Sequence, residues 1–351
     1  MRIIIATTQV PFVRGGAEMH AEGLRDALQR EGHAAEIVAI PFKWYPPERL
    51  LDVMLACRLL DLSEFHGNRT DVLIGLKFPA YYIPHPRKVL WILHQHRAAY
   101  DLWGHEFENL HHFPNGDQIR SAITRADCQL IPEARGVFTN SQNVAARLRL
   151  YCGIESQPLY HPPPHAEQFY CSSVTGDYLF FPSRINRAKR QDLVLKALAC
   201  TRSPVRIRFS GLADEEVYPR ELEALSQELG VQKRVEWLGY VSQEEKVELC
   251  AHAVGILYPP LNEDYGYVSL EAMLSSKPLI TCTDSGGPLE LVQPDVTGLV
   301  AEPSPQALAS AMDLLWQDRT HAQQMGQAGR NLYASLNISW KHVTDQLLSC
   351  F

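Results

Sequence analysis

Ile3-Ile4-Ile5-Ala6-Thr7, followed by a loop that ends in Gly15-Gly16, is the stretch from which the fold of this chain can be predicted. A short run of apolar, mostly β-branched residues is typical of a parallel strand buried on both faces. After the two glycines, alanines and leucines recur at helical spacing as far as Gly32, and glycine commonly ends helices. These residues predict a strand, a glycine turn and a helix.

The two glycines of this turn lack the G-x-G-x-x-G spacing of a dinucleotide-binding fold. Two roles remain open for them. They let the backbone approach a ligand closely, or they simply form a tight turn.

Short apolar runs and helical segments alternate along the rest of the chain. In the first half, strands are predicted at 35–40, 72–76, 89–93 and 137–139, with helices at 49–62, 117–135 and from Ser141 to Gly153. The proline-rich stretch His161-Pro162-Pro163-Pro164-His165 interrupts this order. The alternation resumes with strands at 178–181, 205–210, 235–238, 254–258 and 278–282 and helices between them, and closes with helices at 305–317, 322–336 and 340–348.

Strands that alternate with helices predict a doubly wound parallel sheet, and 351 residues are enough for two domains with their own cores. The chain is therefore predicted to be an α/β protein with two Rossmann-like domains that face a cleft, with ligands at the carboxyl ends of the strands. We expect an N-terminal domain at 1–165, a C-terminal domain at 166–335 and a last helix within 336–351.

The composition is that of an ordinary soluble protein, with 46% hydrophobic and 21% charged residues. A net charge of -7 gives no overall bias toward nucleic acid or an anionic membrane. Eight cysteines without a Cys-x-x-Cys pair favour a reducing cytoplasm. The apolar run at the start is too short for a signal peptide, and no apolar segment reaches 18 residues, so the expected location is cytoplasmic.

Two carboxylates eight positions apart, Glu263 and Glu271, flank Gly266 in the stretch 258–272. A helix that begins near Gly266 would offer free N–H groups and the positive end of its dipole to an anion. Carboxylates beside such a site accept hydrogen bonds from hydroxyls, which suits a sugar linked to a nucleoside diphosphate. Glu263 would then reach the sugar and Glu271 the ribose. The alternative is a surface loop followed by a capped helix.

Two cations, Arg184 and Lys189, follow the strand predicted at 178–181. A guanidinium and an ammonium on a strand-to-helix loop can share the charge of a diphosphate and stabilise a leaving nucleotide. A basic loop that merely solubilises the surface is the alternative.

These motifs and others resemble the family-4 retaining glycosyltransferases of GT-B fold. The matches, in the order of the chain, are Gly15-Gly16-x-Glu18, Arg184-x4-Lys189, Val235-x-Trp237-Leu238-Gly239-x-Val241, Glu263-x7-Glu271, Asp284-Ser285-Gly286-Gly287-Pro288-x-Glu290 and Thr297-Gly298-Leu299-Val300. The resemblance covers essentially the whole chain and is densest at 178–310.

The resemblance implies a nucleotide sugar bound mainly to the second domain, with Arg184 and Lys189 on its phosphates, Glu271 on the ribose and Glu263 near the transferred sugar. It also implies that the last helix crosses back to the first domain. Further donor contacts implied by the resemblance are Gly15, Gly16, Ser183, Gly239, Tyr240, Val241, Gly266, Tyr267, Val268 and Ser269.

His94 is the fourth residue expected in the catalytic set, because it follows a predicted strand and the family often has a histidine there. Core packing and a metal site are the alternatives for His94 and His96. The chain has no Asp-x-Asp pair to hold a divalent ion, so no metal and no other cofactor is expected, and cations and helix dipoles would stabilise the leaving diphosphate.

The expected reaction is transfer of a hexose, with retention, from a nucleotide sugar to a hydroxyl of a glycan or lipid-linked acceptor. The motif at 284–288 looks more like that of mannosyltransferases using GDP-mannose. An epimerase, a phosphorylase and a non-catalytic sugar-nucleotide sensor are the rivals.

Bases alternate with aromatic residues in the first domain, at Lys77, Phe78, Tyr81, Tyr82, Arg87 and Lys88. This pattern could hold a lipid-linked acceptor or touch the cytoplasmic face of a membrane. An ordinary solvated face is the alternative.

Overall fold

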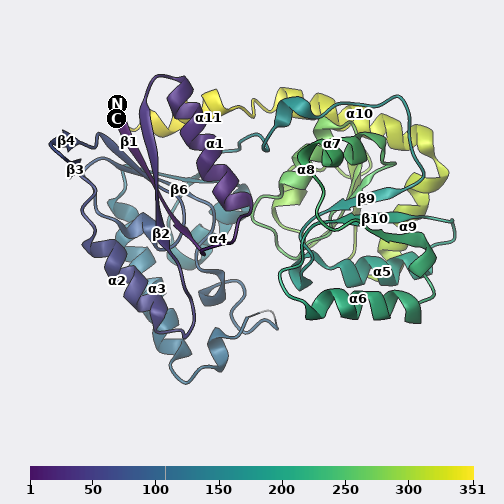
Figure 1. Ribbon diagram of the computed structural model, residues 1–351, viewed down its shortest axis with the longest axis horizontal. Helices are drawn as coiled ribbons and strands as arrows, with labels where there is room; N and C mark the ends of the chain where they lie inside the picture. Colours follow the sequence, from purple (N-terminus) through teal and green to yellow (C-terminus); the bar gives the residue numbers. More distant parts are fainter. Residues whose placement is uncertain (107) are drawn as a thin grey trace. The chain divides into compact units, whose positions relative to one another are not determined.

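The computed structural model describes residues 1–106 and 108–351, which form two compact units. Unit 1 contains residues 1–164 and 338–351, and unit 2 contains residues 165–337. Each unit is built on a six-stranded sheet in which every neighbouring pair of strands is parallel, with helices packed on the sheet (Figure 1). The two doubly wound sheets confirm the predicted α/β fold class.

In unit 1 the strand order is β2-β1-β5-β6-β7-β8. The strands are β1 (Arg2–Gln9), β2 (Ala34–Pro41), β5 (Val72–Gly75), β6 (Lys88–Ile92), β7 (Gly136–Thr139) and β8 (Gln157–Pro158). The helices are α1 (Gly16–Arg30), α2 (Arg49–Leu59), α3 (Gly116–Leu130), α4 (Gln142–Cys152) and α11 (Trp340–Leu348), and a small hairpin joins β3 (Glu64–Phe65) to β4 (Asn68–Arg69). Neither the hairpin nor β8 was predicted, because segments this short carry no periodic signal.

The helix that ends the chain, α11, packs within unit 1 against α1. Its first residue, Trp340, covers Gly23 so closely that a Cβ at position 23 would lie 2.3 Å from the indole ring. The rings of His20, Trp91 and His161 surround the same indole at centroid distances of 5.4–6.4 Å. A residue without a side chain on α1 therefore makes room for the docking of α11.

In unit 2 the strand order is β11-β10-β9-β12-β13-β14. The strands are β9 (Leu179–Pro182), β10 (Ile207–Ser210), β11 (Val235–Trp237), β12 (Ile256–Leu257), β13 (Leu279–Cys282) and β14 (Gly298–Ala301). The helices are α5 (Gln191–Cys200), α6 (Val217–Glu228), α7 (Gln243–His252), α8 (Tyr267–Leu274), α9 (Pro305–Gln317) and α10 (Arg319–Ser335).

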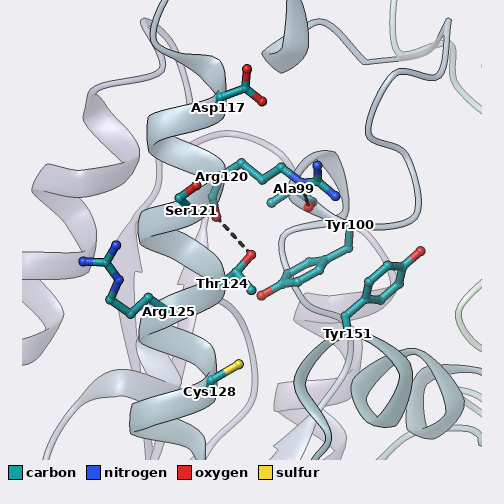
Figure 2. Close-up of a pocket in the computed structure, with 9 residues that line it drawn as sticks. All are labelled: Ala99, Tyr100, Asp117, Arg120, Ser121, Thr124, Arg125, Cys128 and Tyr151. Atoms are coloured by element: carbon teal, nitrogen blue, oxygen red, sulfur yellow. Dashed lines mark hydrogen bonds between the residues drawn. The ribbon is translucent and has the colours of Figure 1, made fainter.

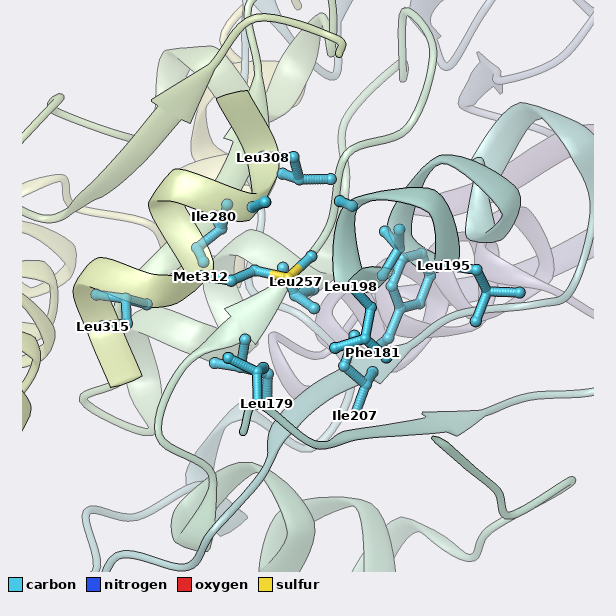
Figure 3. Packing of buried hydrophobic residues seen from close by; sticks show 14 of the residues in the cluster. Leu179, Phe181, Leu195, Leu198, Ile207, Leu257, Ile280, Leu308, Met312 and Leu315 are labelled. Carbon is cyan, nitrogen blue, oxygen red and sulfur yellow. The ribbon is translucent and has the colours of Figure 1, made fainter. Parts of the chain in front are cut away.

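The main core of unit 2 lies between the sheet and the helices α5 and α9, as Figure 3 shows. Leu179 and Phe181 project from β9, and Leu198 comes from α5. The helix α9 contributes Leu308, Met312 and Leu315, and all of these residues are fully buried. The strand order reverses direction between β9 and β12, and ligands of open α/β sheets bind at such a reversal, outside the carboxyl ends of the strands. The loops after β9 and β12 are therefore where a ligand is expected.

The aromatic and basic residues expected on a surface of unit 1 are mostly core residues, so that expectation was wrong. Phe78, Tyr81, Tyr82 and Lys88 are 0–3% exposed. The hydroxyls of both tyrosines donate to the buried carboxylate of Asp127, and the Lys88 ammonium lies 3.2 Å from a carboxylate oxygen of Glu133. These polar ends are satisfied inside the fold and cannot contact a membrane or an acceptor.

Within the described residues, none of the helices combines the length and the apolar character that crossing a bilayer requires.

Candidate functional site

Main-chain hydrogen bonds join three loops at the carboxyl edge of the sheet in unit 2. The loop after β12 donates from Leu261 to the carbonyl of Ala188, in the loop after β9, at 2.8 Å. It also pairs with the loop after β13, because the N–H of Glu263 donates to Ser285 at 2.9 Å and that of Gly287 donates to Glu263 at 2.8 Å. The backbone of Glu263 is thereby fixed between its two neighbours.

Arg190 ties the same three loops together through its side chain. Its guanidinium donates to both carboxylate oxygens of Asp284, at 2.6 and 2.8 Å, and to the carbonyls of Pro259 and Pro260, at 2.8 and 2.7 Å. Such a bidentate, charge-assisted pair is among the strongest and most directional of side-chain interactions. The sequence did not single out this pair, since 94 positions separate the partners and no local pattern links them.

Two glycines shape the start of α8 at this edge. Gly266 has a φ of +83°, a left-handed conformation that glycine adopts at little cost, and it directly precedes the helix. A Cβ at Gly287 would lie 2.8 Å from the carbonyl oxygens of Asp264 and Tyr265. These two glycines therefore let the loops around Glu263 pack closely against the amino end of α8.

Lys189 and Glu263, both predicted as site residues, form an ion pair. The ammonium of Lys189 also donates to the hydroxyl of Tyr258 at 3.1 Å. Burial, together with the nearby charge of Glu263, holds the pKa of Tyr258 well above its usual range. Tyr258 therefore stays protonated. Among Lys189, Tyr258 and Glu263, the cation is Lys189.

Glu271 lies in α8 with its side chain only 5% exposed, and it forms an ion pair with Lys246 of α7 at 2.7 Å. Burial disfavours the charge of Lys246, but the adjacent Glu271 carboxylate outweighs this effect and raises the pKa of Lys246. The second carboxylate oxygen of Glu271 has no hydrogen-bond partner in the described part of the chain. Lys246 was missed from the sequence, since it lies in a different helix with no motif of its own.

Arg184 follows β9 as predicted, but its guanidinium pairs with Asp214 at 3.1 Å rather than with the Lys189–Glu263 group. Asn186 donates to the same Asp214 carboxylate at 2.8 Å. Arg184 is half exposed, and its charge acts on Tyr258, where it opposes the rise of the pKa. Its guanidinium is thus near the site but held by a surface carboxylate.

The other predicted donor contacts of unit 2 also lie at carboxyl ends of strands. Ser183 follows β9, where a Cβ at Gly211 would lie 2.2 Å from its carbonyl oxygen, and Gly239, Tyr240 and Val241 follow β11. Tyr240 is 72% exposed. The remaining three, Tyr267, Val268 and Ser269, form the first turn of α8.

In unit 1, Gly15 and Gly16 lie where α1 begins, beside the reversal of strand order between β1 and β5. The N–H of Gly15 donates to the Glu18 carboxylate at 2.8 Å, and the Lys77 ammonium lies 3.7 Å from the other oxygen of Glu18. The N–H of Gly15, expected to face a ligand, is thus already used by the cap of α1.

His94 lies two residues after β6, half-buried, with its Nδ1 atom 2.7 Å from the carbonyl of Gln95. The neighbouring His96 differs from it, because its ring packs against Phe78 at 5.1 Å. Burial, and then the charge of His94, lowers the pKa of His96 to about 4. His96 is therefore neutral at physiological pH.

An open hollow of about 500 Å³ runs along one face of α3 in unit 1 (Figure 2). Tyr100 and Tyr151 form its far wall, while Arg125 points away from them. The Arg120 guanidinium donates to the carbonyl of Ala99 at 3.0 Å and covers the ring of Trp103 at 4.7 Å. The charge of Arg120 is therefore already engaged, while Arg125 is exposed.

No cluster of three or more His, Cys, Asp and Glu side chains that could bind a metal ion occurs among the residues described.

Comparison with known proteins relates this arrangement to sugar transfer. Residues 172–332 match the model of the family described as glycosyl transferases group 1. The chain is 29% identical over 197 residues to the alpha-1,3/1,6-mannosyltransferase ALG2 of Mus musculus, which is 52% of this chain and 45% of that protein. It is 24% identical to an uncharacterized glycosyltransferase of Methanocaldococcus jannaschii, over all of this chain and 98% of that protein.

A crystal structure of Anabaena HepE in complex with UDP-glucose has a similar fold, with a TM-score of 0.72 and 17% identity over 99% of this chain and 98% of that one. This likeness concerns the fold alone. The matched segment spans less than half the length of the mannosyltransferases named ALG2.

Proposed function

We propose that the chain moves a hexose from a nucleotide sugar to an acceptor hydroxyl with retention of configuration, because residues 172–332 match the family described as glycosyl transferases group 1. The observation that supports this most is the pair of ionic groups at one sheet edge. Lys189–Glu263 and Glu271–Lys246 flank the amino end of α8, at the point where the strand order reverses.

We propose that the diphosphate of the donor binds Lys189, Arg184 and the amino end of α8. Lys189 is now neutralised by Glu263, and a diphosphate, with more negative charge than a carboxylate, would compete for its ammonium. That exchange would release Glu263 toward the hydroxyls of the transferred sugar. The oxygen of Glu271 that Lys246 leaves unoccupied would accept hydrogen bonds from the ribose.

Stabilisation of the leaving diphosphate is assigned to cations and N–H groups of the chain rather than to a metal ion. Turnover is therefore expected to be unchanged in excess chelator. The measurement is the release of nucleoside diphosphate with and without EDTA, and activity that is lost with EDTA and restored by magnesium or manganese would contradict the assignment.

GDP-mannose is our first candidate donor. The motif at 284–288 and the partial similarity to mannosyltransferases support it, whereas the solved structure named above holds UDP-glucose. Thermal unfolding measured across nucleotide sugars tests this choice, because a ligand that binds only the native state raises its apparent stability. A larger shift with UDP-glucose than with GDP-mannose would overturn the choice of donor but leave the class of reaction intact.

Unit 1 is proposed to bind the acceptor, a glycan or a lipid-linked sugar, and His94 is proposed as its contribution to the catalytic set. The test of the whole proposal is a transfer assay in which Glu263→Gln is compared with the unmodified chain. Binding of every nucleotide sugar without turnover on any acceptor would favour a sensor, and conversion of the donor without an acceptor would favour an epimerase.

We propose the cytoplasm as the place of this reaction. All eight cysteines are free thiols, which fits a reducing compartment.

A further inference from the structure

A second hollow, of about 420 Å³, lies in unit 2 at the opposite edge of the sheet from Glu263. Lys277, which lines it, comes just before β13, whereas the loop at 283–287 follows the same strand. The other walls are the segment 171–175 and one face of α10. This hollow is therefore separate from the proposed donor site.

Lys277 is the unusual residue of this hollow. Only 6% of it is exposed, yet its ammonium has no hydrogen-bond or ion-pair partner among residues 1–106 and 108–351. Its main-chain N–H is satisfied by the carbonyl of Ala272 at 2.9 Å. Burial of the ammonium lowers the pKa of Lys277, which the thiol of Cys171 opposes only in part.

Among the described residues, the other buried lysine, Lys88, and the half-buried Lys246 each have a carboxylate partner. Lys88 lies 3.2 Å from Glu133, and Lys246 lies 2.7 Å from Glu271. A mostly buried ammonium without a counterion costs free energy, because water solvates its charge less well than that of an exposed lysine. An anion supplied from outside would remove that cost for Lys277.

The rest of the lining offers hydrogen bonds without any negative charge. It carries hydroxyls and glutamine amides and includes no carboxylate, namely Ser172, Ser173, Thr175, Ser276, Thr320, Gln323, Gln324 and Gln327. The hydroxyl of Ser276 is itself buried and has no partner in the described structure. Thr320, in the first turn of α10, adds a hydroxyl to the lining, while the N–H of His321 in the same turn already donates to the capping Asp318 carboxylate at 2.8 Å.

We propose that this hollow binds the phosphoryl group of a small phosphorylated sugar. Lys277 provides the positive charge, and the hydroxyls and amides around it provide donors for phosphoryl oxygens and partners for sugar hydroxyls. The volume exceeds what a phosphate ion alone needs and leaves room for a hexose. The hollow along α3 has no comparable buried cation, since its Arg120 already contacts Ala99 and Trp103 and its Arg125 is exposed.

The proposal can be tested on the full chain with glucose 6-phosphate, inorganic phosphate and malonate as probes. Excess GDP and UDP are kept present so that the proposed donor site cannot take up the probe. Binding is measured by titration calorimetry. A second readout is the rate at which iodoacetamide modifies Cys171, which lines the hollow, relative to the exposed Cys200 on α5, resolved by mass spectrometry.

Glucose 6-phosphate is expected to bind and to slow modification of Cys171 but not of Cys200. Lys277→Met should weaken this binding by about tenfold or more, as expected for the loss of a charge-assisted hydrogen bond. Gln323→Glu, at an exposed position, places a like charge beside the phosphate and should have the same effect without disturbing the core. Lys233→Met is the matched control, because it removes an exposed lysine outside the hollow.

Equal binding of inorganic phosphate and glucose 6-phosphate would support a phosphoryl site and assign the affinity to that group alone. Malonate binding as tightly as either phosphate would overturn the proposed ligand class. Unchanged binding in both Lys277→Met and Gln323→Glu, or no protection of Cys171 by either phosphate, would overturn the site. None of these results depends on whether the chain transfers a sugar.

Discussion

At the scale of single residues, Glu263 and Glu271 differ in the cations that hold their carboxylates. Glu263 pairs with Lys189, which a diphosphate could draw away, whereas Glu271, the more buried of the two glutamates, pairs with Lys246. The first pair can exchange partners when a donor binds, and the second holds one oxygen of Glu271 in place. This difference supports separate roles in transfer and in nucleotide binding.

We therefore predict different kinetic effects for the two glutamine substitutions. Glu263→Gln should lower kcat by about 10² to 10³ without weakening donor binding, since it removes a charge needed in the transition state and also a competitor of the diphosphate for Lys189. Glu271→Gln should weaken donor binding by about tenfold with a smaller effect on kcat. Steady-state kinetics and calorimetry with the donor measure both, and equal losses of donor affinity in the two variants would refute this division.

At the scale of elements, the amino end of α8 depends on one backbone conformation. Gly266 has a φ of +83°, and a Cβ there would lie 3.1 Å from side-chain atoms of Pro288 and Tyr258. Gly230 also has a positive φ, of +68°, but nothing lies within 4 Å of a Cβ built on it. Substitutions at these two glycines therefore distinguish the effect of backbone strain, which both positions share, from the effect of a clash with Pro288 and Tyr258, which occurs only at Gly266.

Alanine at either position should cost about 1 kcal/mol of stability, because both residues adopt a left-handed conformation. Only Gly266→Ala should also weaken donor binding, since it would displace the loop before α8 and with it the amino end of the helix that is proposed to bind the phosphates. Urea unfolding and donor titration are the measurements. A similar loss of donor affinity in Gly230→Ala would mean that the effect is not local to α8.

The strands and helices were largely predictable because their signals are local. The capped helix from Ser141 to Gly153 is confirmed, since the Ser141 hydroxyl accepts from Val144 and Gly153 is left-handed. Arg190–Asp284 and Lys246–Glu271 were not predictable, because the fold alone brings these partners together. The burial of Tyr81 and Tyr82 was not predictable either, because their hydroxyls donate to Asp127, which lies 46 and 45 positions away in the sequence.

At the scale of the whole molecule, unit 1 contains histidines that are folded in their neutral form. Burial lowers the pKa of His20 to about 3 and that of His96 to about 4, and it also lowers the pKa of His161 well below the usual value. The Nδ1 atom of His20 lies 2.9 Å from the Nε2 atom of His161, so one ring donates to the other while both remain neutral.

The free energy of unfolding should therefore fall as the pH drops from about 6.5 toward 4. In that range the unfolded chain binds protons that these folded histidines do not, and each contributes about 1.4 kcal/mol per pH unit. His96→Phe keeps the aromatic packing and should reduce the slope by that amount, whereas the exposed control His66→Asn should not. Urea titrations between pH 7 and 5 measure the slope, and an identical slope in both variants would contradict this account.

The packing of Trp340 in α11 on Gly23 of α1 can be tested by comparing two glycine-to-alanine variants. Alanine usually stabilises a helix relative to glycine by about 0.5–1 kcal/mol. Gly329→Ala in α10 should follow that rule, since a Cβ there meets its nearest neighbours at 3.8 Å, whereas Gly23→Ala should destabilise the protein because its Cβ would lie 2.3 Å from Trp340. Thermal unfolding of both variants is the measurement, and a stabilised Gly23→Ala would show that Trp340 does not pack on α1.

This packing also bears on the order in which the protein is made. The ribosome completes residues 165–337 before it releases the Trp340 that covers Gly23, so unit 2 can fold while unit 1 still lacks its last helix. Until then the ring cluster around His20 and Trp91 is open to water or to a chaperone. Unit 1 can thus be completed only after the residues of unit 2 have been synthesised.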